Sequence, residues 1–286
     1  MIGFICDSVV DLPEELARRD DVFVVPVMVI LNGKSYREGQ EIEKKTILQH
    51  LEKNFAHTSL PNPTDVLESY RSMVERGYNE LLVINLSGSL SGTHNLFATM
   101  AAQFMSENPN VHIECIDSLS LSGGAAMLVY RAFMMKERGD SLKVIASDLR
   151  KRAGKDNIVF FVLPTLKYLK ESGRIGKLEA ALGQILNVKP VVTIDRSGVF
   201  SQVGRTRGMK KAVEKMVERL KSAVNGKKIF CIALYHSGND NETMTLVSWV
   251  KEQISGLSKV LFAGELSAGI LVHGGSGIIG IGALVG

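Results

Sequence analysis

Cysteine is scarce in this 286-residue chain, which contains three. Cys6, Cys115 and Cys231 lie far apart, each within an apolar run typical of a β-strand. An odd, scattered set excludes a disulfide-framework protein and favours a reducing compartment, so we expect a cytoplasmic protein with small core cysteines. No Cys/His spacing resembles a zinc site, and we expect neither a metal nor a cofactor.

Long uninterrupted apolar runs are also missing. No run reaches about 18 residues without a charge, a polar break or a glycine cluster, which predicts no membrane-spanning helix and no stable membrane insertion. The first apolar run meets Asp7 too early for a signal peptide. With 45% hydrophobic and 22% charged residues, the composition is that of a globular protein long enough for two domains.

Motifs for nucleotides and nucleophiles are incomplete. The run Gly275–Gly280 matches G-x-G-x-x-G, but the helix and the acidic residue about 20 positions later that a dinucleotide site needs do not follow. Gly176-Lys177 lacks the other residues of a P-loop. Leu90 stands where a nucleophile elbow requires serine. We therefore expect a binding protein without its own catalytic centre.

The order of strand-like and helix-like segments predicts an α/β protein. Strands at 2–7, 81–86 and 112–117 alternate with helical patterns, which indicates a parallel sheet with helices on both faces. The expected helices include one at 13–19 capped by Asp11 and one from Pro63 capped by Asn62, after a loop over 57–63.

The second half has a different pattern. A hairpin over 190–203, helices at 165–171, 178–186, 209–224 and 242–254, and strands and turns over 266–286 indicate a mixed sheet. We predict two domains, an N-terminal parallel-sheet α/β/α domain over 1–156 and a C-terminal mixed-sheet α/β domain over 157–286.

Charge is unevenly distributed along the chain, whose net charge is +4. Residues 1–156 carry 17 basic and 21 acidic side chains, whereas residues 157–286 carry 17 basic and 9 acidic. The basic second half indicates either an anionic partner or substrate, or simply two solvated surfaces of different sign.

The most informative segment runs from Ser87 to Thr93, Ser-Gly-Ser-Leu-Ser-Gly-Thr. It lies between a strand-like and a helix-like run, where α/β proteins expose backbone N–H groups and bind anions. The segment therefore predicts an anionic ligand without identifying it.

Three basic or imidazole side chains are further candidates. His273 precedes a glycine-rich turn where a ligand could approach the backbone closely, although a structural histidine is the other interpretation. Arg174 follows a glycine after a short helix, either as a surface arginine or as a functional one. Arg205 and its basic neighbours suit an acidic or phosphate-bearing partner, but no aromatic platform accompanies them, so we expect no nucleic acid.

Several of these segments together resemble the bacterial DegV family. Those that carry the resemblance are Thr58-Ser59-Leu60-Pro61-Asn62-Pro63, Leu90-Ser91-Gly92-Thr93, Leu169–Gly176, Lys189-Pro190-Val191 and His273-Gly274-Gly275-Ser276-Gly277. They are similar to that family's T-S-x-P-S-P, L-S-G-T, L-x-x-S-G-R-I-G, K-P-V and H-x-G-x-G motifs. Leu60, Asn62 and Ser276 depart from the family's usual Gln, small hydroxyl and Pro.

The resemblance implies a two-domain lipid-binding protein. Such proteins hold one long-chain fatty acid such as palmitate, with the carboxylate between the domains and the tail in an apolar tunnel. Many serve as the fatty-acid-binding subunit of a bacterial fatty acid kinase, and present the carboxylate to a separate ATP-dependent catalytic subunit that makes acyl phosphate.

The residues are suited to that ligand. A carboxylate removed from water needs several donors, which Thr58, Ser59 and Ser91 offer as hydroxyls, and His273 through an imidazole nitrogen. Gly92 and Thr93 offer N–H groups at a helix start. We assign these six to the ligand, and Arg174 and Arg205 to the partner surface.

Two other functions stay open from the sequence. The serine- and glycine-rich turn and the basic second half also suit an enzyme acting on a small phosphorylated or keto metabolite. A regulatory module that binds nucleic acid through Arg174 and the basic segment 205–211 is the other alternative.

Overall fold

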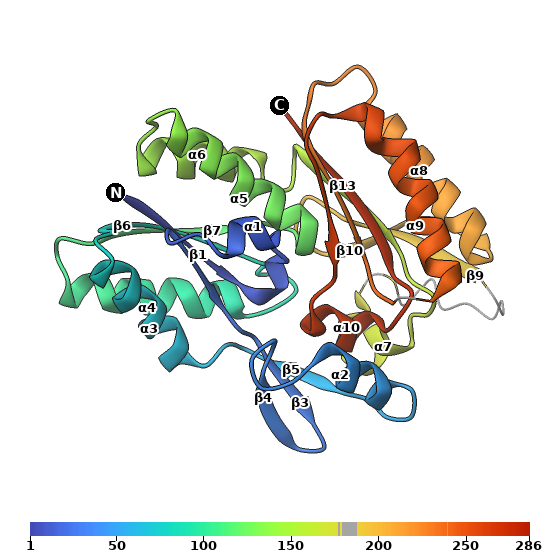
Figure 1. Cartoon of the computed structure of the whole chain (residues 1–286), viewed down its shortest axis with the longest axis horizontal. Helices are drawn as coiled ribbons and strands as arrows, with labels where there is room; N and C mark the ends of the chain where they lie inside the picture. The colour runs from blue at the N-terminus through green and yellow to red at the C-terminus, as the bar shows by residue number, and fades with distance from the viewer. Residues whose placement is uncertain (177, 179–187, 239) are drawn as a thin grey trace.

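The computed structural model describes residues 1–176, 178, 188–238 and 240–286, and shows an α/β protein built around two larger sheets and one small one (Figure 1). The helix predicted over 178–186 lies outside the described residues, apart from Leu178. Among the described helices, none combines the length and the apolar character needed to cross a bilayer.

The first sheet is parallel, as predicted, with strand order β2-β1-β6-β7. Its strands are β1 (Ile2–Asp7), β2 (Val22–Val25), β6 (Glu80–Asn85) and β7 (His112–Asp117). One face packs on α3 (Pro63–Glu75) and α4 (Thr93–Glu107), the other on α5 (Ser122–Glu137) and α6 (Leu142–Arg152). Asn62 caps α3 as predicted, since its side chain accepts a hydrogen bond from the Thr64 N–H at 3.0 Å.

A small antiparallel sheet of order β4-β3-β5 projects from this first half of the chain (Figure 1). It contains β3 (Met28–Leu31), β4 (Lys34–Arg37) and β5 (His57–Ser59), with α2 (Lys44–Leu51) between β4 and β5. Asn32 and Gly33, both at positive φ, form the predicted two-residue turn between β3 and β4. The loop predicted over 57–63 is wrong at its start, because three residues that pair with a distant strand are too few to show an alternating pattern.

The second large sheet is mixed, with strand order β10-β9-β8-β13-β11-β12. Its strands are β8 (Asn157–Val162), β9 (Val188–Ile194), β10 (Phe200–Arg207), β11 (Ile229–His236), β12 (Leu261–Glu265) and β13 (Ile279–Val285). The helices α8 (Met209–Val224) and α9 (Asn241–Ile254) cover one face, and a one-turn 3-10 helix (Ser255–Leu257) follows α9. The sequence predicts the bounds of α8 as the structure has them.

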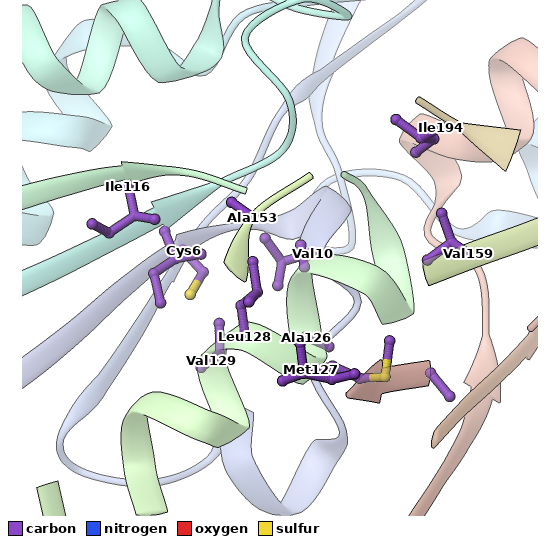
Figure 2. Close-up of a cluster of buried hydrophobic side chains, with 14 of the residues drawn as sticks. Cys6, Val10, Ile116, Ala126, Met127, Leu128, Val129, Ala153, Val159 and Ile194 are labelled. Carbon is purple, nitrogen blue, oxygen red and sulfur yellow. The ribbon is translucent and has the colours of Figure 1, made fainter. Parts of the chain in front are cut away.

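Helix α5 lies between the two large sheets and contributes to one continuous core (Figure 1). Figure 2 shows its Leu128 and Val129 near Cys6 of β1, with Val159 of β8 on the other side. The predicted division between residues 156 and 157 falls between α6 and β8 and stays a prediction, because α5 packs on strands from both sides of it.

Two predicted elements differ from the structure. Residues 266–286 contain a helix, α10 (Ala268–Gly274), before β13, where we predict strands and turns. Most of its residues are buried, so it shows no polar face, and tertiary packing overrides the low helix propensity of its glycines. The helix predicted over 13–19 shrinks to α1 (Glu14–Ala17), with Pro13 as its N-cap residue. Asp11 ends the preceding 3-10 helix (Ser8–Val10) at φ 51°, so the cap that we assign to it is wrong.

Candidate functional site

A cavity of about 430 Å³ lies between the parallel sheet's loops and the mixed sheet. Its wall takes residues from β5, the loop before α4, the start of α5, α10 and strands β8, β11 and β13. The volume is within the ~300–1,000 Å³ typical of small-molecule sites. Hydroxyls, an imidazole and a guanidinium gather where β5, α4 and α10 meet, whereas the sheet side of the wall is mostly aliphatic and aromatic.

Thr58 and His273 form one side of the polar end. Thr58 Oγ1 and His273 Nε2 are 2.7 Å apart and hydrogen-bonded, across 215 residues of sequence. Thr58 stands on β5, and His273 stands in the last turn of α10, which packs against α2, α7 (Lys167–Glu171), β3 and β5 (Figure 1). The pairing therefore depends on the small antiparallel sheet being docked on α10.

Ser91, Gly92 and Thr93 form a second polar segment of the wall, where α4 begins. Ser91 Oγ lies 2.9 Å from Thr93 Oγ1 and accepts a hydrogen bond from the Thr93 N–H at 3.3 Å. Gly92 is the N-cap residue of α4 and has no side chain to shield the helix end. The first N–H groups of a helix lack intrahelical partners and carry the positive end of its dipole, so this segment favours an anion.

His273 is neutral at neutral pH. Burial is the main cause that lowers the pKa of its imidazole to about 4, and the neighbouring Arg174 and His57 contribute to the same shift. Its Nδ1 is buried without a hydrogen-bond partner among the described residues. A neutral imidazole that is bonded to Thr58 can donate or accept one hydrogen bond, depending on its tautomer, without pairing a full charge.

Two carboxylates from the first half hold the start of α10. Asp11 Oδ1 accepts the Ser267 N–H at 2.9 Å, and Glu38 Oε1 accepts the Gly269 N–H at 2.8 Å. Burial raises the pKa of Asp11 to about 7 and also raises that of Glu38. These acids fix the helix that carries His273. Their role cannot be predicted from the sequence, because no local pattern marks contacts separated by 256 and 231 residues.

The structure brings the six predicted ligand residues to one cavity. Thr58, Ser59, Ser91, Gly92, Thr93 and His273 all line it. Arg174 lines it as well, with an exposed side chain whose Nη1 donates to the Ser172 carbonyl at 2.5 Å. Arg205 is exposed on β10 and is absent from the cavity wall, so the two arginines that we group as a partner surface differ in position.

The described residues form neither a metal site nor a reactive thiol site. No three His, Cys, Asp or Glu side chains among these residues come together in a way that could hold a metal ion. The three cysteines are unpaired, Cys6 and Cys231 being buried, and burial raises the pKa of Cys115 and of Cys231 to about 12. They behave as small core residues, as the sequence predicts.

Comparison with known proteins gives one family over nearly the whole chain. A family model described as "Uncharacterised protein, DegV family" matches residues 1–285. A DegV domain-containing protein of Clostridium acetobutylicum is 29% identical over 98% of this chain and 97% of its own. Another from Deinococcus radiodurans is 30% identical over the same shares.

Solved structures agree with the sequence relatives. A DegV family protein from Thermus thermophilus, described as fatty-acid-binding, superposes with a TM-score of 0.88 at 34% identity, over 99% of each chain. A stearic-acid-binding protein from Eubacterium ventriosum gives a TM-score of 0.88 at 27% identity, over 100% of this chain and 98% of its own. Because the family model matches residues 1–285 and these relatives are similar over nearly their whole length, the chain belongs to the DegV family.

Proposed function

We propose that the protein binds one long-chain fatty acid such as palmitate and presents its carboxylate to a separate ATP-dependent fatty acid kinase subunit, which forms acyl phosphate. The observation that carries the proposal is the division of one cavity into a polar end with hydroxyl, imidazole and helix N-terminal donors and an apolar remainder. The Thermus thermophilus and Eubacterium ventriosum relatives, described as fatty-acid-binding and stearic-acid-binding, support it.

The carboxylate is assigned to Thr58, Ser59, Ser91, Gly92, Thr93 and His273. The hydroxyls come from β5 and from the start of α4, and α4 directs the positive end of its dipole to the same cavity. Because His273 is neutral, the carboxylate would be held by hydrogen bonds rather than by a buried ion pair. Such a site can release the carboxylate group to the active site of the kinase subunit more readily than a site with a buried arginine could.

The acyl tail supplies most of the affinity in this proposal. At about 0.8 kcal/mol per buried methylene, about fourteen methylenes give a gross ~11 kcal/mol. Loss of translational and rotational freedom offsets part of that gain. The remainder is large enough for a lipid to stay bound through purification.

The partner surface is assigned to the basic second half. Arg205 is exposed on β10, beside Arg207 and away from the cavity wall, and suits an acidic or phosphate-bearing partner. Arg174 stands at the cavity wall with its side chain exposed, where a docked subunit would meet the carboxylate. If its role is docking, Arg174→Ala keeps lipid binding but weakens acyl phosphate formation; loss of lipid binding would move Arg174 to the ligand site.

In this proposal the protein is a cytoplasmic binding subunit without a cofactor or a catalytic centre of its own. The alternative, an enzyme for a small phosphorylated or keto metabolite, suits the cavity less well. Polar side chains gather at one end of the wall, and the hydroxyls of Ser122 and Tyr235 elsewhere in it already donate to Asp11. A polar molecule that filled the remainder would find few hydrogen-bond partners.

Native mass spectrometry of the purified protein, before and after denaturation, tests the proposal. We expect one bound molecule per chain whose released mass is that of a fatty acid between myristic and stearic acid. Purified protein that carries no lipid and also fails to bind added palmitate would overturn it. Stabilisation by phosphate but not by palmitate would favour the metabolite enzyme.

A further inference from the structure

A glycine stands between two aromatic residues on the sheet side of the cavity. In the antiparallel register, Gly280 of β13 pairs with Phe161 of β8 and with Tyr235 of β11. Residues directly opposite each other in a sheet project from the same face, and all three line the cavity. Phe161, Gly280 and Tyr235 therefore form a row across three strands, with a gap at the glycine and one aromatic side chain on either side of it.

The strand register also gives the order of positions along the cavity. Ile278 contacts the glycine after His273, since a Cβ built on Gly274 would lie 2.3 Å from Ile278 Cδ1. Gly280 and Gly282 follow on the same strand, about 7 and 14 Å further from Ile278 at ~3.4 Å per residue. Gly280 thus lies between the polar end and the far end.

The far end is closed at Gly282. A Cβ on Gly282 would lie 2.9 Å from Met127 Cε and 3.0 Å from Val159 Cγ1, and Met127 is fully buried. Gly280 is different, because it is only half-buried although its strand is central in the sheet. Strands cover both of its edges, and Ile279 and Ile281 beside it belong to the core on the other face of the sheet, so the exposed surface of Gly280 faces the cavity that it lines.

Neither backbone geometry nor packing requires glycine at position 280. Its φ is outside the left-handed region, and the atoms nearest to an added Cβ would be Phe161 Cβ at 3.4 Å and two carbonyl oxygens at 3.8 Å, which are ordinary contact distances. Glycine weakens a strand interior, where β-branched residues are favoured, and often marks a close approach of a ligand. The missing side chain is therefore best explained by what passes over it.

We propose that Gly280 is a specificity-determining residue, and that the gap between Phe161 and Tyr235 admits the acyl chain to the far end at Gly282. The inference rests on the proposed fatty acid binding and adds the residue that sets chain length. A side chain at position 280 would occupy the gap and stop longer acyl chains there. The carboxylate site would be unchanged, because it lies beyond Ile278, two residues before Gly280.

The test compares delipidated Gly280→Ala and Gly280→Val proteins with the parent by calorimetric titration of decanoate and stearate. We expect Gly280→Val to weaken stearate binding more than about tenfold while decanoate stays within about threefold, and Gly280→Ala to give a smaller shift in the same direction. Ile279→Val, on the opposite face of the same strand, is the matched control, and we expect it to leave both affinities unchanged.

The outcomes separate this inference from the proposed function. Equal weakening of both acids, or no change in either, in a Gly280→Val protein that melts like the control overturns the role of Gly280. If Gly280→Val does not fold, Gly280→Ala decides the question by the same ratio. A parent protein that binds neither acid contradicts the proposed function itself.

Discussion

The carboxylate of Asp11 accepts a hydrogen bond at 2.9 Å from the backbone N–H of Ser267, 256 residues further along the chain. The other oxygen of the same carboxylate accepts the hydroxyl of Ser122 at 2.5 Å, so one buried acid joins the N-terminal half, α5 and the start of α10. Because α10 ends in the turn that carries His273, this acid helps to place one side of the polar end of the cavity.

Replacing Asp11 with asparagine should alter how stability depends on pH. Burial raises the pKa of Asp11 to about 7, whereas an unfolded aspartate titrates near ~3.9. Between these values the native state binds more protons than the unfolded state, so this group's contribution to stability falls as pH rises. Asparagine stays neutral and keeps an acceptor for Ser267, so Asp11→Asn should gain stability relative to the parent from pH 4.5 to pH 8, by up to about 4 kcal/mol.

Urea unfolding of parent and variant at a series of pH values measures that difference. Asp20→Asn, on the exposed surface, is the matched control and should run parallel to the parent. If the curve of Asp11→Asn also runs parallel to that of the parent, the pKa of Asp11 is not raised in the native protein.

Removing the Ser91 hydroxyl should weaken palmitate binding. Hydrogen bonds to charged groups contribute about 1.5–3 kcal/mol, so Ser91→Ala should raise the Kd roughly tenfold or more. Ser89 is the control, because its hydroxyl donates to the Ser197 carbonyl at 2.7 Å and it is absent from the cavity wall. Calorimetric titration should show Ser89→Ala within about twofold of the parent; equal losses in both variants would argue against a ligand role for Ser91.

Local signals in the sequence predict the elements that carry a regular period. The helix α8 has a buried stripe through Val213, Met216 and Leu220, and Asn32-Gly33 is a turn signal, so both are found from neighbouring residues alone. Elements that depend on distant partners are missed. The strand β5 is defined only by its pairing with β3, and α10 is buried on most sides and shows no polar face.

The same division holds for the site. The resemblance of short motifs to those of the DegV family, together with the donor chemistry of their side chains, makes Thr58, Ser91 and His273 candidates, and the structure brings all three to one cavity. Nothing local shows that Thr58 and His273 touch, or that Glu38 holds the start of α10, because both contacts require the complete fold. The position of Gly280 between two aromatic residues follows only from strand register.

A methyl group at Gly123 should destabilise the protein, although alanine is normally favoured over glycine in a helix by about 1 kcal/mol. An added Cβ would lie 2.6 Å from Ala233 Cβ and 2.7 Å from Tyr235 Cδ2, where α5 packs closely on β11. We expect Gly123→Ala to cost about 2 kcal/mol or more and to lower the Tm by roughly 4 °C or more. Gly256→Ala has open space within 4 Å and should melt at or slightly above the parent; equal Tm values for the two variants would contradict the close packing.

Reversing the charge of Arg205 should separate lipid binding from lipid presentation. Arg205 is exposed on β10 and is absent from the cavity wall, so Arg205→Glu should leave the palmitate Kd within about twofold of the parent. If β10 docks an acidic surface of the kinase subunit, the reversal introduces repulsion and should slow acyl phosphate formation roughly tenfold or more, with the loss shrinking at high salt.

Lys151→Glu on α6 makes the same change in net charge on an exposed position of the first half and should leave the rate unchanged. A similar loss in both variants would reflect overall charge rather than docking, and an unchanged rate for Arg205→Glu would remove β10 from the partner surface.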